Sequence, residues 1–103
     1  MMNPMSMMKN IQQMQAKMQA LQTEMEAAVF QGQAAGGLVT VEVTGKFECK
    51  SVKIDKSLAD PEDMETLEDA VQVAINDAVG KSTTTMATKM SAITGGMKIP
   101  GIN

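Results

Sequence analysis

The stretch LVTVEVTGKFECKSVKID, residues 38–55, decides the fold because its pattern specifies a β-hairpin. Valine stands at positions 39, 41 and 43, and polar residues fill the positions between them, which is the period of a strand with one buried face. Gly45-Lys46 can form a tight turn between this strand and the next. The pattern therefore predicts antiparallel strands over about residues 38–45 and 47–55.

The second strand of this hairpin breaks its own alternation. Phe47 and Cys49 are apolar at odd positions, whereas Val52 and Ile54 are apolar at even positions. One face of the sheet can hold all of these side chains only if the strand contains an extra residue. We therefore expect a β-bulge near Lys50-Ser51.

The hairpin is preceded by a predicted helix over about residues 5–28 and a short strand over about 28–32, joined to the hairpin by the loop QAAGG at 33–37. Pro4 stands near the start of the helix, where a residue without an N–H is tolerated. Apolar residues recur along the helix at spacings of three and four, as in a coiled coil. This first-helix stripe consists of Met7, Ile11, Met14, Met18, Leu21, Met25 and Ala28. It packs either on the chain's own sheet or across an interface with a second copy, and the sequence leaves both open.

The hairpin is followed by a second, longer helix, predicted over about residues 61–94. Asp60 can cap it, and Pro61 suits its first turn. The six acidic residues in 60–69 lack the ligand spacing of a calcium loop, so we interpret them as a solvated helix start rather than a metal site. Gly80 and the threonines at 83–85 are weak helix formers, which predicts a kink or fraying there.

Both helices are too long for one small domain. An unbroken helix over 61–94 would span about 50 Å, whereas a compact domain of this size is about 33 Å across. The distal part must project into solvent or be covered by another subunit, so we infer a homodimer. The expected fold is α+β over residues 1–103 as a single domain: an N-terminal helix, a three-stranded antiparallel sheet, a long C-terminal helix and a flexible tail at 95–103.

The composition excludes most catalytic chemistry. The chain has no His, Arg, Trp or Tyr, so it lacks an imidazole base, an ordinary zinc site and a guanidinium fork for phosphates. No glycine motif that cradles phosphates is present. We therefore expect no enzyme activity, no cofactor, no metal and no small-molecule substrate. Cys49 is the single cysteine, and we interpret it as a small apolar strand residue rather than a reactive thiol.

No membrane partner is expected either. The N-terminal residues contain no continuous apolar segment of signal-peptide length, and no apolar run approaches the ~20 residues of a membrane span. We therefore expect a cytoplasmic protein.

A series of short motifs runs through the chain in a fixed order. They are GGLV (36–39), Val41, Gly45, VKIDKSL (52–58), INDA (75–78) and TGGMKIPG (94–101). Together with the Gln- and Met-rich first helix, the series resembles the YbaB/EbfC family of bacterial nucleoid-associated proteins over essentially the whole chain. The resemblance implies a tweezers-like homodimer with a shared β core and projecting helical arms. It also implies sequence-tolerant binding to double-stranded DNA and a cytoplasmic, nucleoid-linked role.

The resemblance points to particular residues. The lysines that it implies as DNA contacts are Lys9, Lys17, Lys81, Lys89 and Lys98. The residues that we expect at the dimer interface are Val39, Val41, Val43, Leu67 and Val71. The chain departs from the family after INDA, where relatives often carry Arg and Lys pairs: residues 79–83 contain a single lysine, Lys81.

The charge distribution favours DNA binding only locally. The net charge is −3, the wrong sign for an obvious DNA-binding protein. However, segments 1–23 and 80–103 contain five lysines and no acid, whereas 60–69 contains six acids and no lysine. A dimer could therefore have positive tips and a negative body, and lysines at the tips would bind phosphates by releasing counterions. The same lysines could instead be solvated charges on two polar helices.

An alternative function is a protein-interaction or chaperone-like adaptor. Methionine side chains adapt to varied apolar partners, and a Met-rich surface between the arms would suit this role. Its members would be Met2, Met5, Met7, Met8, Met86, Met90 and Met97. The same methionines could instead pack in the core or along a dimer interface.

Overall fold

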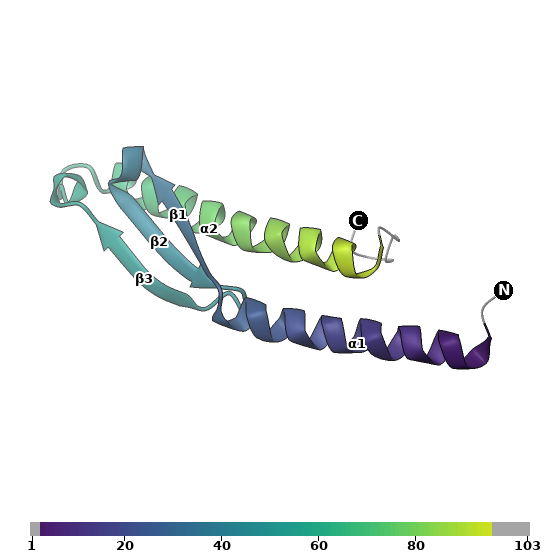
Figure 1. Ribbon diagram of the computed structural model, residues 1–103. Coiled ribbons are helices and arrows are strands. Elements are labelled where there is room, and N and C mark those ends of the chain that lie inside the picture. Colours follow the sequence, from purple (N-terminus) through teal and green to yellow (C-terminus); the bar gives the residue numbers. More distant parts are fainter. Residues whose placement is uncertain (1–2, 96–103) are drawn as a thin grey trace.

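Residues 3–95 are described by the structure, a computed structural model of the 103-residue chain (Figure 1). These residues form two α-helices, α1 (Pro4–Ala27) and α2 (Met64–Ile93), around a three-stranded sheet. The strands are β1 (Val29–Ala34), β2 (Val39–Thr44) and β3 (Cys49–Ile54), and short 3-10 helices η1 (Ala35–Gly37) and η2 (Lys56–Leu58) follow β1 and β3. The expected α+β class is confirmed. Of the expected tail at 95–103, all but Gly95 lies outside the described residues.

The sheet is antiparallel throughout, in the order β1-β2-β3. Its register shifts once: Glu42 pairs with Ser51, whereas the next residue, Val43, pairs with Cys49. Lys50 is therefore the extra residue in β3, and the bulge expected near Lys50-Ser51 is confirmed. Because of this insertion, the apolar residues on both sides of the bulge face the same side of the sheet.

The core lies between β2 and α2, which crosses one face of the sheet (Figure 1). The valines of β2 meet a row of small residues spaced by one helical turn, and this row allows close packing. The central contacts are made by Val39, Val41 and Val43 with Ala70, Ala74 and Ala78. On β1, a Cβ atom at Gly32 would collide with the backbone of α2 at Ala74. Glycine and alanine therefore set the short distance between helix and sheet.

This packing bears on the residues expected at the dimer interface. Val39, Val41 and Val43 are 0%, 0% and 3% exposed in a single chain, so their side chains offer no surface to a second copy. Leu67 and Val71 are only half-buried, and Val71 packs against the edge of the core.

The first helix extends away from the sheet instead of lying on it (Figure 1). Only its C-terminal part is covered, by α2 and by the hairpin turn, where the Gly45 N–H donates a hydrogen bond to the Met25 carbonyl at 3.0 Å. Leu21 and Met25 are each 4% exposed, whereas Ile11 is 53% exposed. The interpretation that the first-helix stripe packs on the chain's own sheet is therefore wrong. The stripe is buried near the hairpin and uncovered towards the N-terminus.

The molecule is elongated, as the helix lengths predicted. Its radius of gyration is 19.3 Å and its extents are 70 × 23 × 17 Å, whereas a compact chain of this length would have a radius of about 13 Å.

Three boundaries differ from the expected ones for local reasons. β1 continues through Gln33 and Ala34, which were expected in a loop, because Ala34 pairs with Val39. β3 begins two residues later than expected, since Phe47 has a φ of 64°, which no strand residue adopts. α2 begins at Met64 instead of 61: the carboxylate of Asp63 accepts the Thr66 N–H at 3.3 Å and is the N-cap in place of Asp60.

The expected kink in the second helix is absent from the described residues. α2 is continuous from Met64 to Ile93 and passes through Gly80 and the threonines without a break. Tertiary contacts offset the weak helix propensity there, because Ala78 and Ser82 on either side of Gly80 are buried.

Candidate nucleic-acid interface

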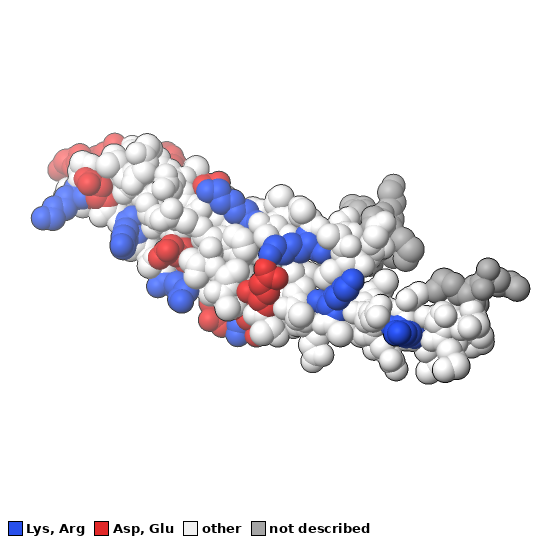
Figure 2. All heavy atoms as spheres, viewed as in Figure 1, with Lys and Arg blue, Asp and Glu red and all other residues white. Residues whose placement is uncertain are grey.

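We call two helical segments the arms: α1, and residues 80–93 of α2. The second segment begins against the edge of the sheet, and farther out the two run side by side along a shared cleft. Figure 2 shows red spheres gathered, with some blue, at the end of the molecule far from the arms, whereas the visible face of the arms carries blue patches and one red patch at their root. The lysines of the arms are thus separated from most of the acidic residues. The arms are therefore the candidate nucleic-acid interface.

Lys9 and Lys17 lie on α1 and are exposed. Within residues 3–95, neither forms an ion pair. Each side chain is therefore available to an anion in solution. They are eight residues apart, which corresponds to about 12 Å along the helix and hence to more than one phosphate spacing on DNA.

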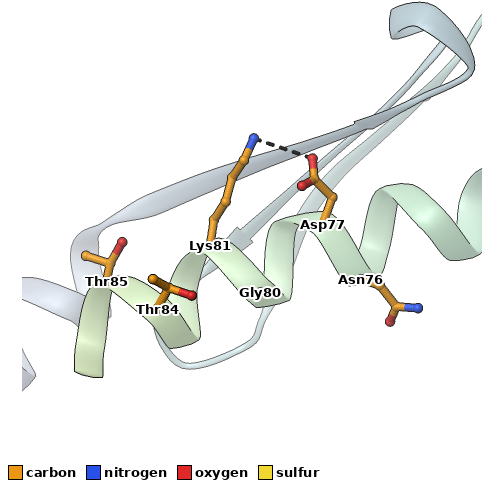
Figure 3. Close-up of a pocket in the computed structure, with 6 residues that line it drawn as sticks. All are labelled: Asn76, Asp77, Gly80, Lys81, Thr84 and Thr85. Atoms are coloured by element: carbon orange, nitrogen blue, oxygen red, sulfur yellow. Dashed lines mark ion pairs between the residues drawn. The ribbon is translucent and has the colours of Figure 1, made fainter. Parts of the chain in front are cut away.

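Lys81 is engaged with the edge of the sheet (Figure 3). Its Nζ donates a hydrogen bond to the Gln31 carbonyl of β1 at 2.8 Å and lies 3.4 Å from Asp77 Oδ2. The same Asp77 oxygen accepts the Gln33 N–H at 3.1 Å. This backbone N–H, together with Lys81, holds the pKa of Asp77 below its ordinary value. The two side chains thus bind the outer edge of β1, and the Lys81 charge is partly neutralised.

A shallow hollow of about 390 Å³ lies beside this pair on α2. Figure 3 shows that Lys81 and Asp77 point to one side of the helix, towards the strand, and that Asn76 points away from it. The other lining residues are Gly80, Thr84 and Thr85. Amide and hydroxyl groups can contact a phosphate, but Asp77 adds a negative charge. We therefore regard this hollow as a weaker phosphate site than the lysines farther out on the arms.

Lys89 faces α1 and forms an ion pair with Glu24. Beside this pair, a cleft of about 340 Å³ separates the arms, and Lys17 lines it together with Leu21, Ala92 and Ile93. The structure therefore brings Lys17 and Lys89 to one cleft and leaves Lys9 farther out on α1. Lys98 lies outside the described residues. Sequence reasoning missed Glu24, because its partner is 65 residues away in the chain and neither residue belongs to a motif.

The methionines of the predicted Met-rich surface do not form one patch. Met86 and Met90 line an apolar cleft of about 350 Å³ at the root of the arms, beside Phe47. Met5, Met7 and Met8 lie in the first turns of α1, about 25 Å away along the helix. Met2 and Met97 lie outside the described residues.

The part of the chain that the structure describes has neither a metal-ligand cluster nor a membrane-spanning helix. No three acidic or cysteine side chains in residues 3–95 lie close enough together to hold a metal ion. Neither α1 nor α2 has a stretch that is long and apolar enough to cross a bilayer.

A profile of the YbaB/EbfC DNA-binding family matches residues 1–97. The chain belongs to this family. The resemblance that the motif series predicted is thereby confirmed, and it includes the arms as well as the sheet. YbaB/EbfC is a DNA-binding family, so membership makes DNA the first ligand to consider for the arm lysines.

Two similar relatives are named nucleoid-associated proteins. One, from Afipia carboxidovorans, is 45% identical over 96 residues and covers 93% of this chain and 91% of its own. The other, from Gluconobacter oxydans, is 45% identical over 94 residues and covers 91% of this chain and 88% of its own. A crystal structure of an uncharacterized protein from Helicobacter pylori has the same fold, with a TM-score of 0.76. It covers 92% of this chain and 100% of that chain at 21% identity, so this likeness shows the fold alone.

Proposed function

We propose that this protein is a nucleoid-associated homodimer that binds double-stranded DNA with little sequence preference through lysines on its arms. The observation that carries the proposal is the separation of charge along the molecule: exposed lysines stand on the arms of a DNA-binding family member, away from the acidic residues at 60–69. The relatives' names support a cytoplasmic role at the nucleoid. No catalytic step is part of the proposal.

The mechanism is the release of counterions by lysine at backbone phosphates. If four to six phosphates are neutralised, log K should fall with log salt at a slope of roughly −4 to −5. Base reading plays little part, because the chain has no Arg for guanine edges. Lys9 and Lys17 are the first candidates, since neither charge is neutralised by an acid within residues 3–95. Lys89 and Lys81 contribute less, because each is already paired.

The second copy of the chain is proposed to cover β3. The outer edge of β1 is bound by Asp77 and Lys81, whereas no element of residues 3–95 pairs with the outer edge of β3. An unpaired edge strand readily accepts another strand. Val52 and Ile54 of β3 are 47% and 42% exposed, because α2 crosses β1 and β2 but not β3. These apolar side chains would be buried if a second copy packed against them, and no segment of residues 3–95 buries them.

The neighbouring flank of α2 adds to this surface. Leu67, Val71 and Ile75 follow one another at one-turn intervals, on the side of the helix opposite Asp77. We call Val52, Ile54 and these three residues the β3 surface. Leu67 and Val71 thus stay in the proposed interface, whereas the buried valines of β2 leave it.

The proposal is tested by fluorescence anisotropy with two 30-base-pair duplexes of unrelated sequence across a salt series, with sedimentation to measure the mass. We expect similar affinities for both duplexes, a slope near the value above and a mass of twice 11.0 kDa. The double variant Lys9→Gln/Lys17→Gln should weaken binding to both duplexes equally. Lys56→Gln, at the acidic end of the molecule, is the matched control and should not. Wild-type protein that fails to bind either duplex at low salt would refute the DNA-binding role.

The adaptor function retains one supporting observation: Met5, Met7 and Met8 are exposed at the free end of α1. Binding of an apolar peptide that does not weaken with salt, combined with no retention of DNA, would favour this function instead.

A further inference from the structure

The two arms are joined by one charged contact. Lys89 of α2 and Glu24 of α1 are 65 residues apart in the chain and meet as an ion pair across the inter-arm cleft. The other ion pair within residues 3–95, between Lys81 and Asp77, lies inside α2. The Glu24–Lys89 pair is therefore the charged link between α1 and α2 in the described part of the chain.

This link can be exchanged easily. The side chains of Lys89 and Glu24 are 42% and 55% exposed, so water and salt reach both groups, and a pair of this kind contributes little to folding stability. A structural role would favour burial. An exposed carboxylate that occupies a lysine is instead a competitor for any other anion that the lysine could bind.

Competition between Glu24 and a phosphate for Lys89 would affect binding at the cleft between the arms, because a second lysine lies there. Lys17 lines the same cleft and has no acidic partner within residues 3–95, so it presents an unneutralised charge beside a neutralised one. An approaching phosphate would be attracted by Lys17 but would meet the negative charge of Glu24 next to it. Full engagement of both lysines requires that Glu24 release Lys89.

We propose that the Glu24–Lys89 ion pair is an autoinhibitory latch on the phosphate-binding arms. Glu24 holds Lys89 as a phosphate would, and a DNA phosphate must replace the Glu24 carboxylate before Lys89 contributes to binding. This inference rests on the proposed function, because it takes the arm lysines as DNA contacts. On this proposal, Glu24 lowers both the affinity of the arms for DNA and the salt dependence of binding.

The test compares Glu24→Gln with Glu26→Gln in the full-length protein. Both substitutions raise the net charge by one on the same helix, but Glu26 lines a different hollow, beside Gln22 and Lys46, and forms no ion pair within residues 3–95. Binding of a 30-base-pair duplex is measured by anisotropy from 50 to 300 mM salt. Glu24→Gln should bind about tenfold tighter than Glu26→Gln at 50 mM salt, with a salt slope steeper by about 0.9, because one more lysine releases a counterion. Circular dichroism is recorded for both variants to check that they are folded.

A double-mutant cycle with Lys89→Gln separates the latch from a general charge effect. In the wild-type background Lys89→Gln should weaken binding by about twofold or less, whereas in the Glu24→Gln background it should remove the whole gain of about tenfold. Equal affinities and slopes for Glu24→Gln and Glu26→Gln, with DNA still bound, would overturn the latch and leave the proposed function intact. Failure of the wild type and every variant to bind DNA would overturn the proposed function, and the latch with it.

Discussion

Gly32 of β1 lies directly against the backbone of α2, so close that a Cβ atom there would collide with the Ala74 carbonyl oxygen. The same atom would also collide with the backbone nitrogen of Ala78, one turn farther along α2. The hydrogen atom of a glycine therefore sets how closely the long helix approaches the sheet. Because α2 also forms one of the arms, this contact fixes the arm relative to the sheet.

Gly32→Ala should destabilise the fold. The added methyl group meets backbone atoms, which cannot move aside as a flexible side chain would, so the helix has to shift away from the sheet. We expect a loss of about 1–3 kcal/mol in the free energy of unfolding, measured by urea denaturation. Gly80→Ala in α2 is the control, because no atom lies within 4 Å of the added methyl group. It should raise the free energy of unfolding by about 0.5–1 kcal/mol. Equal stability of Gly32→Ala and the wild type would contradict the proposed close contact.

Asp77 should make stability depend on pH. The Gln33 N–H and Lys81 lower the pKa of Asp77 in the folded chain below its ordinary value of 3.8. A group with a lowered folded pKa stabilises the fold fully above its unfolded pKa, and this contribution is lost as pH falls through the folded pKa. The wild type should therefore have a higher Tm than Asp77→Asn at pH 7, and the difference should shrink as the pH falls below 3.8.

Thermal melts between pH 7 and pH 3 check this expectation. Asp69→Asn, at an exposed position of the same helix, is measured alongside as the matched control for replacing one carboxylate by an amide. A Tm difference for Asp77→Asn that stays constant across this range would mean that the carboxylate does not stabilise the edge of β1 in its charged form.

Local sequence patterns predicted the strands and the bulge. They did not predict which side chains pack against which, because that depends on contacts between distant parts of the chain. The alternation of Val39, Val41 and Val43 and the phase change around Lys50 predicted the hairpin and its bulge, because side-chain period is a property of the strand itself. The same pattern could not say what covers the valines. The alanine row of α2 covers them within one chain, which the strand pattern alone could not predict.

The candidate site was likewise predicted only in part from the sequence. Sequence placed lysines on two long helices, and helix length alone predicted an elongated molecule. The sequence could not predict which of these lysines are paired. Glu24 contacts Lys89, and Lys81 contacts Gln31, only in the folded chain. Similarly, propensity predicted a kink at Gly80, but packing of the flanking residues keeps the helix continuous.

A charge on the β3 surface should separate the proposed dimer. Ile75→Glu places a carboxylate on the flank of α2 that we propose to be covered by the second copy, where burying an unpaired charge is costly. We expect monomers at micromolar concentration in sedimentation, with a preserved helical circular dichroism spectrum. Val73→Glu is the matched control, because Val73 is exposed two residues away on the opposite flank, and it should leave the mass unchanged. A wild type that sediments as a monomer would remove the dimer from the proposed function.

Lys17 and Lys81 should differ in their effect on DNA binding. The Lys17 charge has no acidic partner within residues 3–95, whereas Lys81 Nζ is 2.8 Å from the Gln31 carbonyl and 3.4 Å from Asp77. Lys17→Gln should therefore reduce the steepness of the salt slope by about 0.9 and weaken binding by about tenfold at 50 mM salt. Lys81→Gln should change the slope by less than half as much and should instead lower the Tm, because the edge of β1 loses a donor. Lys56→Gln should change neither quantity. If Lys81→Gln flattens the salt slope as much as Lys17→Gln, then Lys81 leaves the sheet edge to reach the phosphates, and its contact with Gln31 is not maintained on DNA.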